Sequence, residues 1–265
     1  MDALVATAQP QVIQESNRDF VGSLAKGLKV LCAFNESSGR MTLTEVARLS
    51  QLPRAGARRL LLTLHALGYV RFDGKHFALS PKVLELGFSY LSSQHWLSVA
   101  SPLLEALRDE LDEAVSVTTL EGTEVVYVAR FPVDRVMTLA MDIGSRKPAY
   151  CTAMGRVLLS ALPDTKIREL LRASDMRQFT GRTLHDMKAV TAAVHEVRQQ
   201  GYCLIDRELE ESLVAISVPL RNYHGETIAA VNVCGHPGTL SLADLKDRCL
   251  PALQAASLKI SQILV

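Results

Sequence analysis

The spacing of the hydrophobic residues changes along the chain, and each change predicts a different kind of element. From about residue 21 to residue 67, apolar positions recur every three or four residues, which is the period of a helix with one buried face. Two short alternating runs follow, and a helical period returns from about residue 81. From residue 114 the period becomes strand-like, with helical segments between the strands. The chain therefore combines helices and strands in an order that differs between its two ends.

The best-defined stretch begins at Thr42, where Thr42-x-x-Glu45 forms a capping box that starts a short helix. Leu52-Pro53 interrupts the helical pattern because proline lacks an amide proton and restricts the residue before it. A second helix restarts at about Arg54. Its buried stripe follows the i, i+3, i+4, i+7 spacing of one helix face and comprises Ala57, Leu60, Leu61 and Leu64.

Three arginines of this second helix, Arg54, Arg58 and Arg59, lie off the buried stripe, with the small Ala55 beside them. Small residues combined with long cations suit a helix in a DNA major groove. After Gly68, two strand-like runs flank Asp73-Gly74, a favoured hairpin dipeptide. Helix, turn, arginine-rich helix and hairpin together predict a winged helix-turn-helix; a merely solvated charged face is the alternative.

The neighbouring segments complete the predicted organisation. Residues 1–19 show no sustained period, whereas Ser23 is a candidate cap for a helix through about Phe34, with Leu24, Leu28 and Leu31 as its buried stripe. Ser80-Pro81 opens a linker helix, and a further helix is predicted from about residue 99 to 111. We therefore expect a tail over 1–20, a DNA-binding domain over 21–80, a linker helix over 81–98 and a larger domain over 99–265.

The larger domain is predicted to be α+β, with helices packed over one mostly antiparallel sheet. Three strand-like runs, VSVTTLEG, EVVYVARF and VMTLAM, precede a loop and a helix that begins near Thr152. A short helix over 164–171 and a longer one follow, the latter opened by Thr183-x-x-Asp186 and closed by Gly201. YCLID, LVAISVPL and TIAAVNVCG are three more strands, and a helix over about 241–264 closes the chain.

Charge is unevenly distributed between these parts. The net charge of the 265 residues is +1, but residues 21–80 hold nine Lys and Arg against three Asp and Glu. Residues 81–265 hold nineteen basic and twenty-two acidic residues. A basic small domain joined to a mildly acidic larger one fits a DNA-reading head on a sensing or assembly body.

Other compositional features limit the remaining function classes. No segment is apolar over the eighteen or more residues of a membrane helix, and the N-terminus lacks a basic region followed by an apolar run, so we expect a cytoplasmic protein. The seven histidines show no metal-ligand spacing, and we predict neither a metal nor a cofactor. The five cysteines form no Cys-x-x-Cys pair and resemble small buried hydrophobes: Cys32, Cys151, Cys203, Cys234 and Cys249.

Several long motifs, in order, resemble the IclR family of bacterial transcription regulators. They are SLAKGLKVLCAF, TLTEVARLSQLPRAGARRLLLTLHALGYV, the hairpin leading to LSPKVLELG, GSRKPAYCTAMGRVLLSAL and GYCLIDRELEESLVAISVPL. The resemblance extends from about Val21 to the C-terminus. LPRAGARR, FSYLSSQ and GSRKPAYCT are most similar to the branch that controls aromatic-acid catabolism through protocatechuate and β-ketoadipate.

The resemblance implies a winged helix-turn-helix, a linker helix and a GAF-like effector-binding domain. It also implies a homodimer or homotetramer that binds a partly palindromic double-stranded DNA operator and responds to a small aromatic or dicarboxylic acid, with RNA polymerase as a further candidate partner. The expected DNA-binding residues are Thr42, Thr44, Arg54, Ala55, Gly56, Arg58, Arg59 and Lys75. Gly56 departs from relatives that carry a small hydroxyl residue or alanine there, and glycine weakens a helix by up to about 1 kcal/mol.

The effector site implied by the family lies between the helix that begins near Thr152 and the later strands. Its expected residues are Thr152, Ala153, Met154, Asp206, Ala215, Asn232 and Cys234. Unpaired amides at a helix N-terminus bind anions, which supports the first of these as a carboxylate site, and Arg146 is a candidate second contact. Arg146 in a surface salt bridge, and Met154, Ala215 and Cys234 as plain core residues, are the alternatives.

Two other classes of protein compete with a ligand-responsive regulator. An enzyme would use Cys151 as a nucleophile with His185 or His195 as base, but no motif places either histidine beside Cys151. A DNA-binding architectural protein without a ligand would need fewer than the roughly 180 residues that follow the hairpin. We therefore predict a regulator that is not an enzyme.

Overall fold

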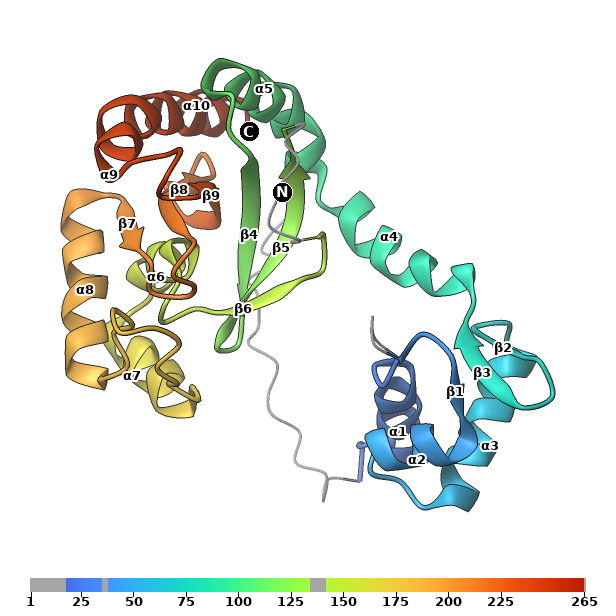
Figure 1. Ribbon diagram of the computed structural model, residues 1–265. Helices are drawn as coiled ribbons and strands as arrows, with labels where there is room; N and C mark the ends of the chain where they lie inside the picture. The colour runs from blue at the N-terminus through green and yellow to red at the C-terminus, as the bar shows by residue number, and fades with distance from the viewer. Residues whose placement is uncertain (1–17, 35–37, 134–141, 265) are drawn as a thin grey trace. The chain divides into compact units, whose positions relative to one another are not determined.

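The computed structural model describes residues 18–34, 38–133 and 142–264, which form two compact units over 1–92 and 93–265. Figure 1 labels the elements of both units. The VMTLAM run, predicted as a strand, and most of the predicted N-terminal tail lie outside the described residues.

In the described part of the first unit, helices α1 (Gly22–Leu31), α2 (Leu43–Leu49) and α3 (Arg54–Ala66) and a small antiparallel sheet form the winged helix-turn-helix that the sequence predicts. The strands β1 (Met41–Thr42), β2 (Val70–Phe72) and β3 (His76–Leu79) pair in the order β1-β3-β2. Apolar residues from all three helices and the sheet form one core beneath them: Val30, Phe34, Met41, Val46, Leu61, Leu64, Val70 and Phe77.

Local sequence signals explain where α2 and α3 begin. The Thr42 hydroxyl accepts the amide of Glu45, and the Glu45 carboxylate accepts the amide of Thr42, so the predicted capping box is confirmed. Gln51 adopts a left-handed backbone conformation in the turn, and Pro53 precedes the first residue of α3. The predicted stripe on α3 is also confirmed, because Ala57, Leu61 and Leu64 are buried and Leu60 is half-buried against the core.

Helix α1 departs from the prediction in its cap and in its buried face. No side chain caps it, its N-cap residue is Val21, and it ends at Leu31 instead of near Phe34. Leu24 and Leu28 are exposed, and Val30 is the residue of this helix that enters the core. Of the predicted stripe, Leu31 packs against the core of this unit, whereas Leu24 and Leu28 do not.

Beyond the wing, the Ser80 hydroxyl accepts the amide of Lys82 and opens a 3-10 turn over Pro81–Val83. Helix α4 (Leu84–Ser93) follows at the position of the predicted linker helix, and none of its residues is buried. Helix α5 (His95–Leu111) belongs to the second unit and begins four residues before the predicted position.

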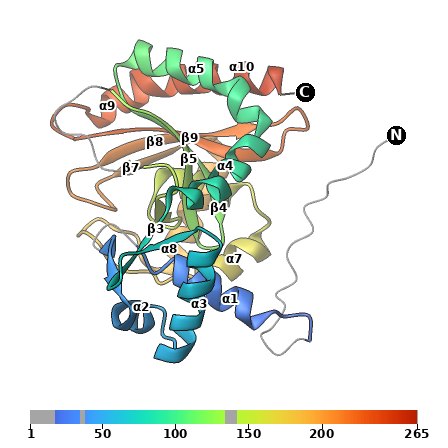
Figure 2. The ribbon, with the colours of Figure 1, turned by 90° about the vertical axis from the view of Figure 1, so that its right-hand side faces the viewer.

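The second unit is built on a six-stranded antiparallel sheet with helices on both faces. Its strands pair in the order β6-β5-β4-β9-β8-β7. Their bounds are β4 (Val115–Glu121), β5 (Glu124–Phe131), β6 (Arg146–Pro148), β7 (Cys203–Asp206), β8 (Val214–Arg221) and β9 (Thr227–Gly235). Helices α5 and α10 (Leu250–Ile263) pack together over one face, and α6 (Ala153–Ser160) packs on the other, with α8 (Met187–Gln200) against it (Figure 2).

The predicted helix ends in this unit are partly confirmed. Thr152 caps α6, and Gly201 closes α8 in a left-handed conformation. However, Asp186 and not Thr183 caps α8, because the Thr183 hydroxyl accepts the amides of Phe179 and Thr180 instead. Helix α7 (Asp164–Ala173) is two residues longer than predicted.

The predicted C-terminal helix is continuous in sequence pattern but irregular in structure. It begins with the short α9 (Leu242–Asp244), capped by Ser241, passes through a π-helical segment over Leu245–Cys249 and continues as α10. A wider turn of this kind keeps Leu245, Cys249 and Leu253 all buried against the sheet.

Candidate nucleic-acid interface and effector site

The exposed face of α3 carries the arginines predicted to bind DNA. Arg54, Arg58 and Arg59 are all exposed, and none forms an ion pair with a residue in the described part of the chain. Free guanidinium groups on one helix face are available for phosphates or guanine edges. Ala55 is exposed between them, which leaves room for close approach of the helix to a groove.

Gly56 lies on a different side of α3 from Arg58. It is half-buried and lines an apolar groove between α1 and α3, together with Leu24, Leu28 and Leu60. Arg59 borders the same groove, whereas Arg58 does not. A Cβ atom on Gly56 would meet nothing within 4 Å, so no close approach requires glycine at this position.

The wing is held by Asp73, whose carboxylate accepts the amides of Lys75 at 3.0 Å and His76 at 2.7 Å. These hydrogen bonds hold the pKa of Asp73 below its usual range, and Arg40 forms an ion pair with the same carboxylate. The Asp73 amide donates to the His76 carbonyl, so Gly74 and Lys75 occupy the centre of the turn. Lys75 is thereby exposed at the tip of the hairpin.

The two threonines predicted to bind DNA differ in availability. The Thr42 hydroxyl is committed to the capping box and donates to Glu45 at 2.8 Å. Thr44 is exposed in the first turn of α2. Thr42 therefore positions α2, while Thr44 is free to contact a partner.

In the second unit, the N-terminus of α6 is fully buried. The Thr152 hydroxyl accepts the amide of Gly155 at 3.2 Å and donates to the carbonyl of Pro148 at 2.9 Å. The next two amides, those of Ala153 and Met154, form no hydrogen bond with another described residue. Buried amide groups without partners are costly, and an anion at this helix end would satisfy both.

Three predicted effector residues lie on the face of the sheet that α6 covers. Ala215 on β8 pairs with Cys234 on β9, and Asn232 lies two residues before Cys234 on the same face. Met154 of α6 packs in the same core cluster as Ala215, with Cys234 against it. The structure therefore brings the start of α6 together with these strand residues, as the sequence predicted.

Asn232 is the polar exception in this region. It is 1% exposed, and neither atom of its amide forms a hydrogen bond with a described residue. Burial raises the pKa of the Cys234 thiol to about 11, and the nearby Arg130 and Asn232 side chains oppose this rise. A buried amide with four unused hydrogen-bonding positions favours a polar ligand in this space.

Arg146 and Asp206 do not join this group. Arg146 is exposed on β6 and pairs with Glu124 at 2.7 Å, which is the salt-bridge alternative. Asp206 pairs with Val214, so strand alternation places it on the opposite face from Ala215. Arg207 and Arg182 both pair with its carboxylate, and the hydrogen bond from Arg207 contributes most to its lowered pKa.

Sequence reasoning missed a buried ion pair that ties α6 to the loop after β7. Arg156 donates to both carboxylate oxygens of Glu208, at 2.8 and 2.6 Å, and to the carbonyl of Tyr150. Glu208 also accepts the amide of Leu184 at 3.0 Å. A charged residue in the otherwise apolar run AMGRVLLS was the available signal. The pair ties the first turns of α6 to the loop after β7.

The same region argues against a thiol nucleophile. Cys151 is fully buried, and burial raises the pKa of its thiol to about 12, so the thiol is protonated at neutral pH.

The described residues contain no group of three metal-binding side chains, and none of their helices is long and apolar enough to cross a membrane.

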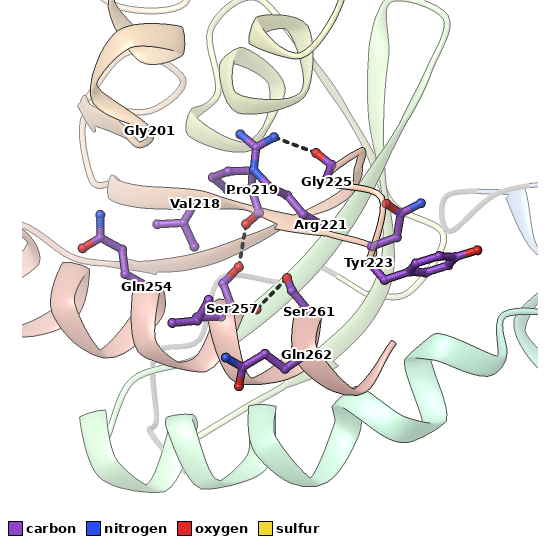
Figure 3. A pocket seen from close by; sticks show the side chains of 12 residues that line it. Gly201, Val218, Pro219, Arg221, Tyr223, Gly225, Gln254, Ser257, Ser261 and Gln262 are labelled. Atoms are coloured by element: carbon purple, nitrogen blue, oxygen red, sulfur yellow. Dashed lines mark hydrogen bonds between the residues drawn. The ribbon is translucent and has the colours of Figure 1, made fainter. Parts of the chain in front are cut away.

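A separate groove lies on the other face of the sheet, between α10 and the β8–β9 turn (Figure 3). Its two serine hydroxyls are satisfied within the protein, because Ser257 donates to the Pro219 carbonyl and Ser261 to the Ser257 carbonyl. Arg221 donates to the carbonyl of Gly225 across the turn. None of the predicted effector residues lines this groove.

A basic winged helix-turn-helix joined to an antiparallel-sheet domain with a buried polar site defines the class of DNA-binding regulators with a sensing domain. Residues 23–74 match the IclR helix-turn-helix domain, and residues 88–262 match the C-terminal domain of bacterial IclR transcriptional regulators. The chain belongs to the IclR family of bacterial transcriptional regulators, as its motifs indicated. Because this is a family of DNA-binding regulators, the prediction that the chain is not an enzyme is confirmed.

Named relatives and solved structures are similar to this chain over most of its length. A Pca regulon regulatory protein from Pseudomonas putida is 42% identical over 96% of this chain and 91% of its own length. The p-hydroxybenzoate hydroxylase transcriptional activator of Acinetobacter baylyi is 36% identical over 93% of each. A regulator structure from Rhodococcus sp. RHA1 is 45% identical, with a TM-score of 0.82 over 92% of this chain and 98% of that one.

One further solved structure contains a small molecule. It is an IclR homologue from Microbacterium hydrocarbonoxydans in complex with 4-hydroxybenzoate, with a TM-score of 0.78 over 91% of this chain and 98% of that one. Its sequence is 23% identical, so the likeness concerns the fold.

Proposed function

We propose that this regulator controls an operon for the catabolism of aromatic acids and that its second unit binds a small carboxylate effector at the N-terminus of α6. The observation that carries this proposal is the pair of buried, unpartnered amides of Ala153 and Met154. Support also comes from the relatives named for Pca regulation and p-hydroxybenzoate hydroxylase activation, and from the neighbour that holds 4-hydroxybenzoate.

Thermal melting of the full-length protein tests the ligand class. Aromatic acids such as 4-hydroxybenzoate, and dicarboxylic acids such as adipate, are added up to millimolar concentration. At least one acid should raise the melting midpoint, because a ligand that binds only the folded state stabilises it by mass action. No shift with any acid would contradict the proposed ligand class and favour an architectural protein that senses nothing.

The predicted site residues make this test residue-specific. Replacing Asn232 by Leu should weaken the ligand response, because the replacement removes the buried amide. Thr152→Val should also weaken the ligand response, because it removes the hydroxyl that caps α6 and fixes the position of its first turn. Both variants should bind operator DNA as the wild type does, since neither residue lies in the first unit.

The DNA partner is proposed to be a partly palindromic operator upstream of the regulated genes. A DNA fragment from the region upstream of the regulator's own gene should shift in a gel, with affinity that falls steeply as salt rises. Contacts are assigned to Thr44, Ala55, Arg58 and Lys75, with Arg54 and Arg59 beside them. Thr42 supports them through the capping box of α2, and Gly56 belongs to the same helix as the arginines but lines the groove beside α1. If the DNA affinity did not change with salt concentration, the proposed contacts between these cations and the phosphates would be wrong.

A homodimer, or a tetramer built from two dimers, is the proposed assembly, because a palindromic operator requires two copies related by symmetry. The exposed apolar residues of the first unit support this: Leu24, Leu28, Leu67, Leu84, Leu86 and Phe88. Light scattering of the wild type against Leu24→Asp with Leu28→Asp should show a smaller particle for the variant. We place the protein in the cytoplasm, on the nucleoid when it is bound to DNA, and RNA polymerase as a partner where it activates.

A further inference from the structure

A second buried polar side chain without a partner lies beside Asn232. Thr118 on β4 is 0% exposed, and its hydroxyl forms no hydrogen bond with a described residue. It pairs with Ala230 on β9, which is two residues from Asn232 and faces the same core cluster beneath α6. Thr118 and Asn232 are therefore diagonal neighbours on one face of two central strands.

The neighbours of these two residues on the adjoining strands are small. Ala230 lies opposite Thr118, and Asn232 lies between two buried serines, Ser116 on β4 and Ser217 on β8. The Ser217 hydroxyl already donates to the Val231 carbonyl at 2.8 Å. Natural cores rarely leave two adjacent polar groups unsatisfied, because each costs about 1–3 kcal/mol. The three free atoms, Oγ1 of Thr118 with Oδ1 and Nδ2 of Asn232, indicate a bound group that meets them together.

The chemistry of the free atoms selects the kind of group. The Asn232 amide presents one acceptor and one donor group, and a threonine hydroxyl both donates and accepts. A neutral hydroxyl on the ligand can bond both residues, since it donates to the Asn232 carbonyl oxygen and accepts from the Thr118 hydroxyl. An ionised carboxylate only accepts, so it would leave the Asn232 carbonyl oxygen unsatisfied and facing a negative charge.

We propose that Thr118 is a specificity-determining residue of the effector site and that, with Asn232, it recognises a ring hydroxyl of an aromatic acid whose carboxylate lies at the start of α6. The inference rests on the proposed function, because it assumes that the site under α6 binds an acid. It goes further by naming a hydroxyl subsite and by preferring hydroxylated aromatic acids to dicarboxylic acids.

The test compares benzoate with 3-hydroxybenzoate and 4-hydroxybenzoate by titration calorimetry on the full-length protein. The measured quantity is the hydroxyl selectivity, which is the Kd for benzoate divided by the Kd for the better hydroxybenzoate. Thr118→Val keeps the shape of the side chain and removes the hydroxyl. It should lower the selectivity about five- to tenfold, which corresponds to one lost hydrogen bond.

Thr119→Val is the matched control, because it makes the same chemical change at the next residue of β4, on the other side of the strand. It should leave the selectivity at the wild-type value. Asn232→Leu should lower the selectivity at least as much as Thr118→Val. Thermal unfolding of each variant confirms that it is folded before titration.

The outcomes separate this inference from the proposed function. Equal affinity of the wild type for benzoate and both hydroxybenzoates, unchanged selectivity in Thr118→Val, or tighter binding of adipate than of any aromatic acid would overturn the hydroxyl subsite alone. A structural water between Thr118 and Asn232 would give the second of these results. Absence of binding by every acid would overturn the proposed function, and this inference with it.

Discussion

The arginines of α3 in the first unit and most of those in the second unit differ in whether they are paired. In the first unit, Arg54, Arg58 and Arg59 stand exposed on α3 without a carboxylate partner among the described residues. In the second unit, most of the described arginines pair with an acid, from the exposed Arg146–Glu124 pair to the buried Arg156–Glu208 pair. The arginines of α3 are therefore available to bind another molecule, whereas the paired arginines of the second unit stabilise its fold.

This comparison has an energetic basis. An exposed, unpaired arginine costs the folded chain little and remains available to replace counterions on a nucleic acid. A buried arginine is tolerated only with a matched carboxylate and satisfied hydrogen bonds, so removing either partner is expensive. Four predictions test this division, from the largest expected effect to the smallest.

Replacing Arg156 by Ala should lower the free energy of unfolding by about 3–5 kcal/mol, because Glu208 would remain buried and unpaired. Urea unfolding at pH 7 measures the change. Arg177→Ala is the matched control, since Arg177 pairs with Asp175 where both side chains are exposed, and its loss should change the stability little. Equal losses in the two variants would contradict the structural role of the buried pair.

Replacing Arg58 and Arg59 together by Ala should reduce operator affinity about a hundredfold or more, with unchanged thermal stability. The slope of log affinity against log salt should fall in magnitude by about 2 if both contact phosphates. Arg168→Ala with Arg172→Ala is the control, because both are exposed on α7 in the other unit. Unchanged DNA binding by the Arg58 and Arg59 variant would remove α3 as the recognition helix.

Asp206 should make stability depend on pH. Its pKa is lowered in the folded state by Arg207 and Arg182, so its contribution is present above the unfolded pKa of about 3.9 and is lost as pH falls toward the lower folded value. The difference in unfolding free energy between wild type and Asp206→Asn should be constant from pH 7 to 5 and shrink below pH 4. A difference that grows on acidification would have the wrong sign for this pairing.

Gly56→Ala should raise the free energy of unfolding by about 0.5–1 kcal/mol, because alanine stabilises a helix and its Cβ atom meets no neighbour within 4 Å. Operator affinity should stay the same, since Gly56 faces the groove beside α1 and not the Arg58 side. Gly155→Ala should have the opposite effect on stability. Its Cβ atom would come within 2.1 Å of the Ala149 carbonyl oxygen, so it should destabilise the protein.

Local signals allowed much of the first unit to be predicted. The capping box at Thr42, the break at Pro53 and the stripe on α3 are short-range features, and the structure reproduces each of them. Helix α1 was misassigned because periodicity identifies an apolar face but not what covers it. Its Leu24 and Leu28 face outward, where another surface would have to cover them.

In the second unit, sequence placed the strands and the start of α6 but not the partners of its polar residues. Arg156 and Glu208 are 52 positions apart, and no spacing rule connects residues at that distance. Asp206 was grouped with the effector site, whereas strand pairing puts it on the other face of β7. Thr118 went unnoticed because a threonine in a strand is ordinary until its neighbours are known.

The sequence by itself determined the order of elements, the DNA-binding head and the family, because helix caps, breakers and periodicity act over a few residues. Only the tertiary structure decided which charges are free and which are paired, and which buried polar atoms lack partners. Those properties depend on sheet register and on helix packing between distant segments. For this reason the arginines of α3 were predictable from sequence, while the hydroxyl subsite at Thr118 and Asn232 emerged only from the fold.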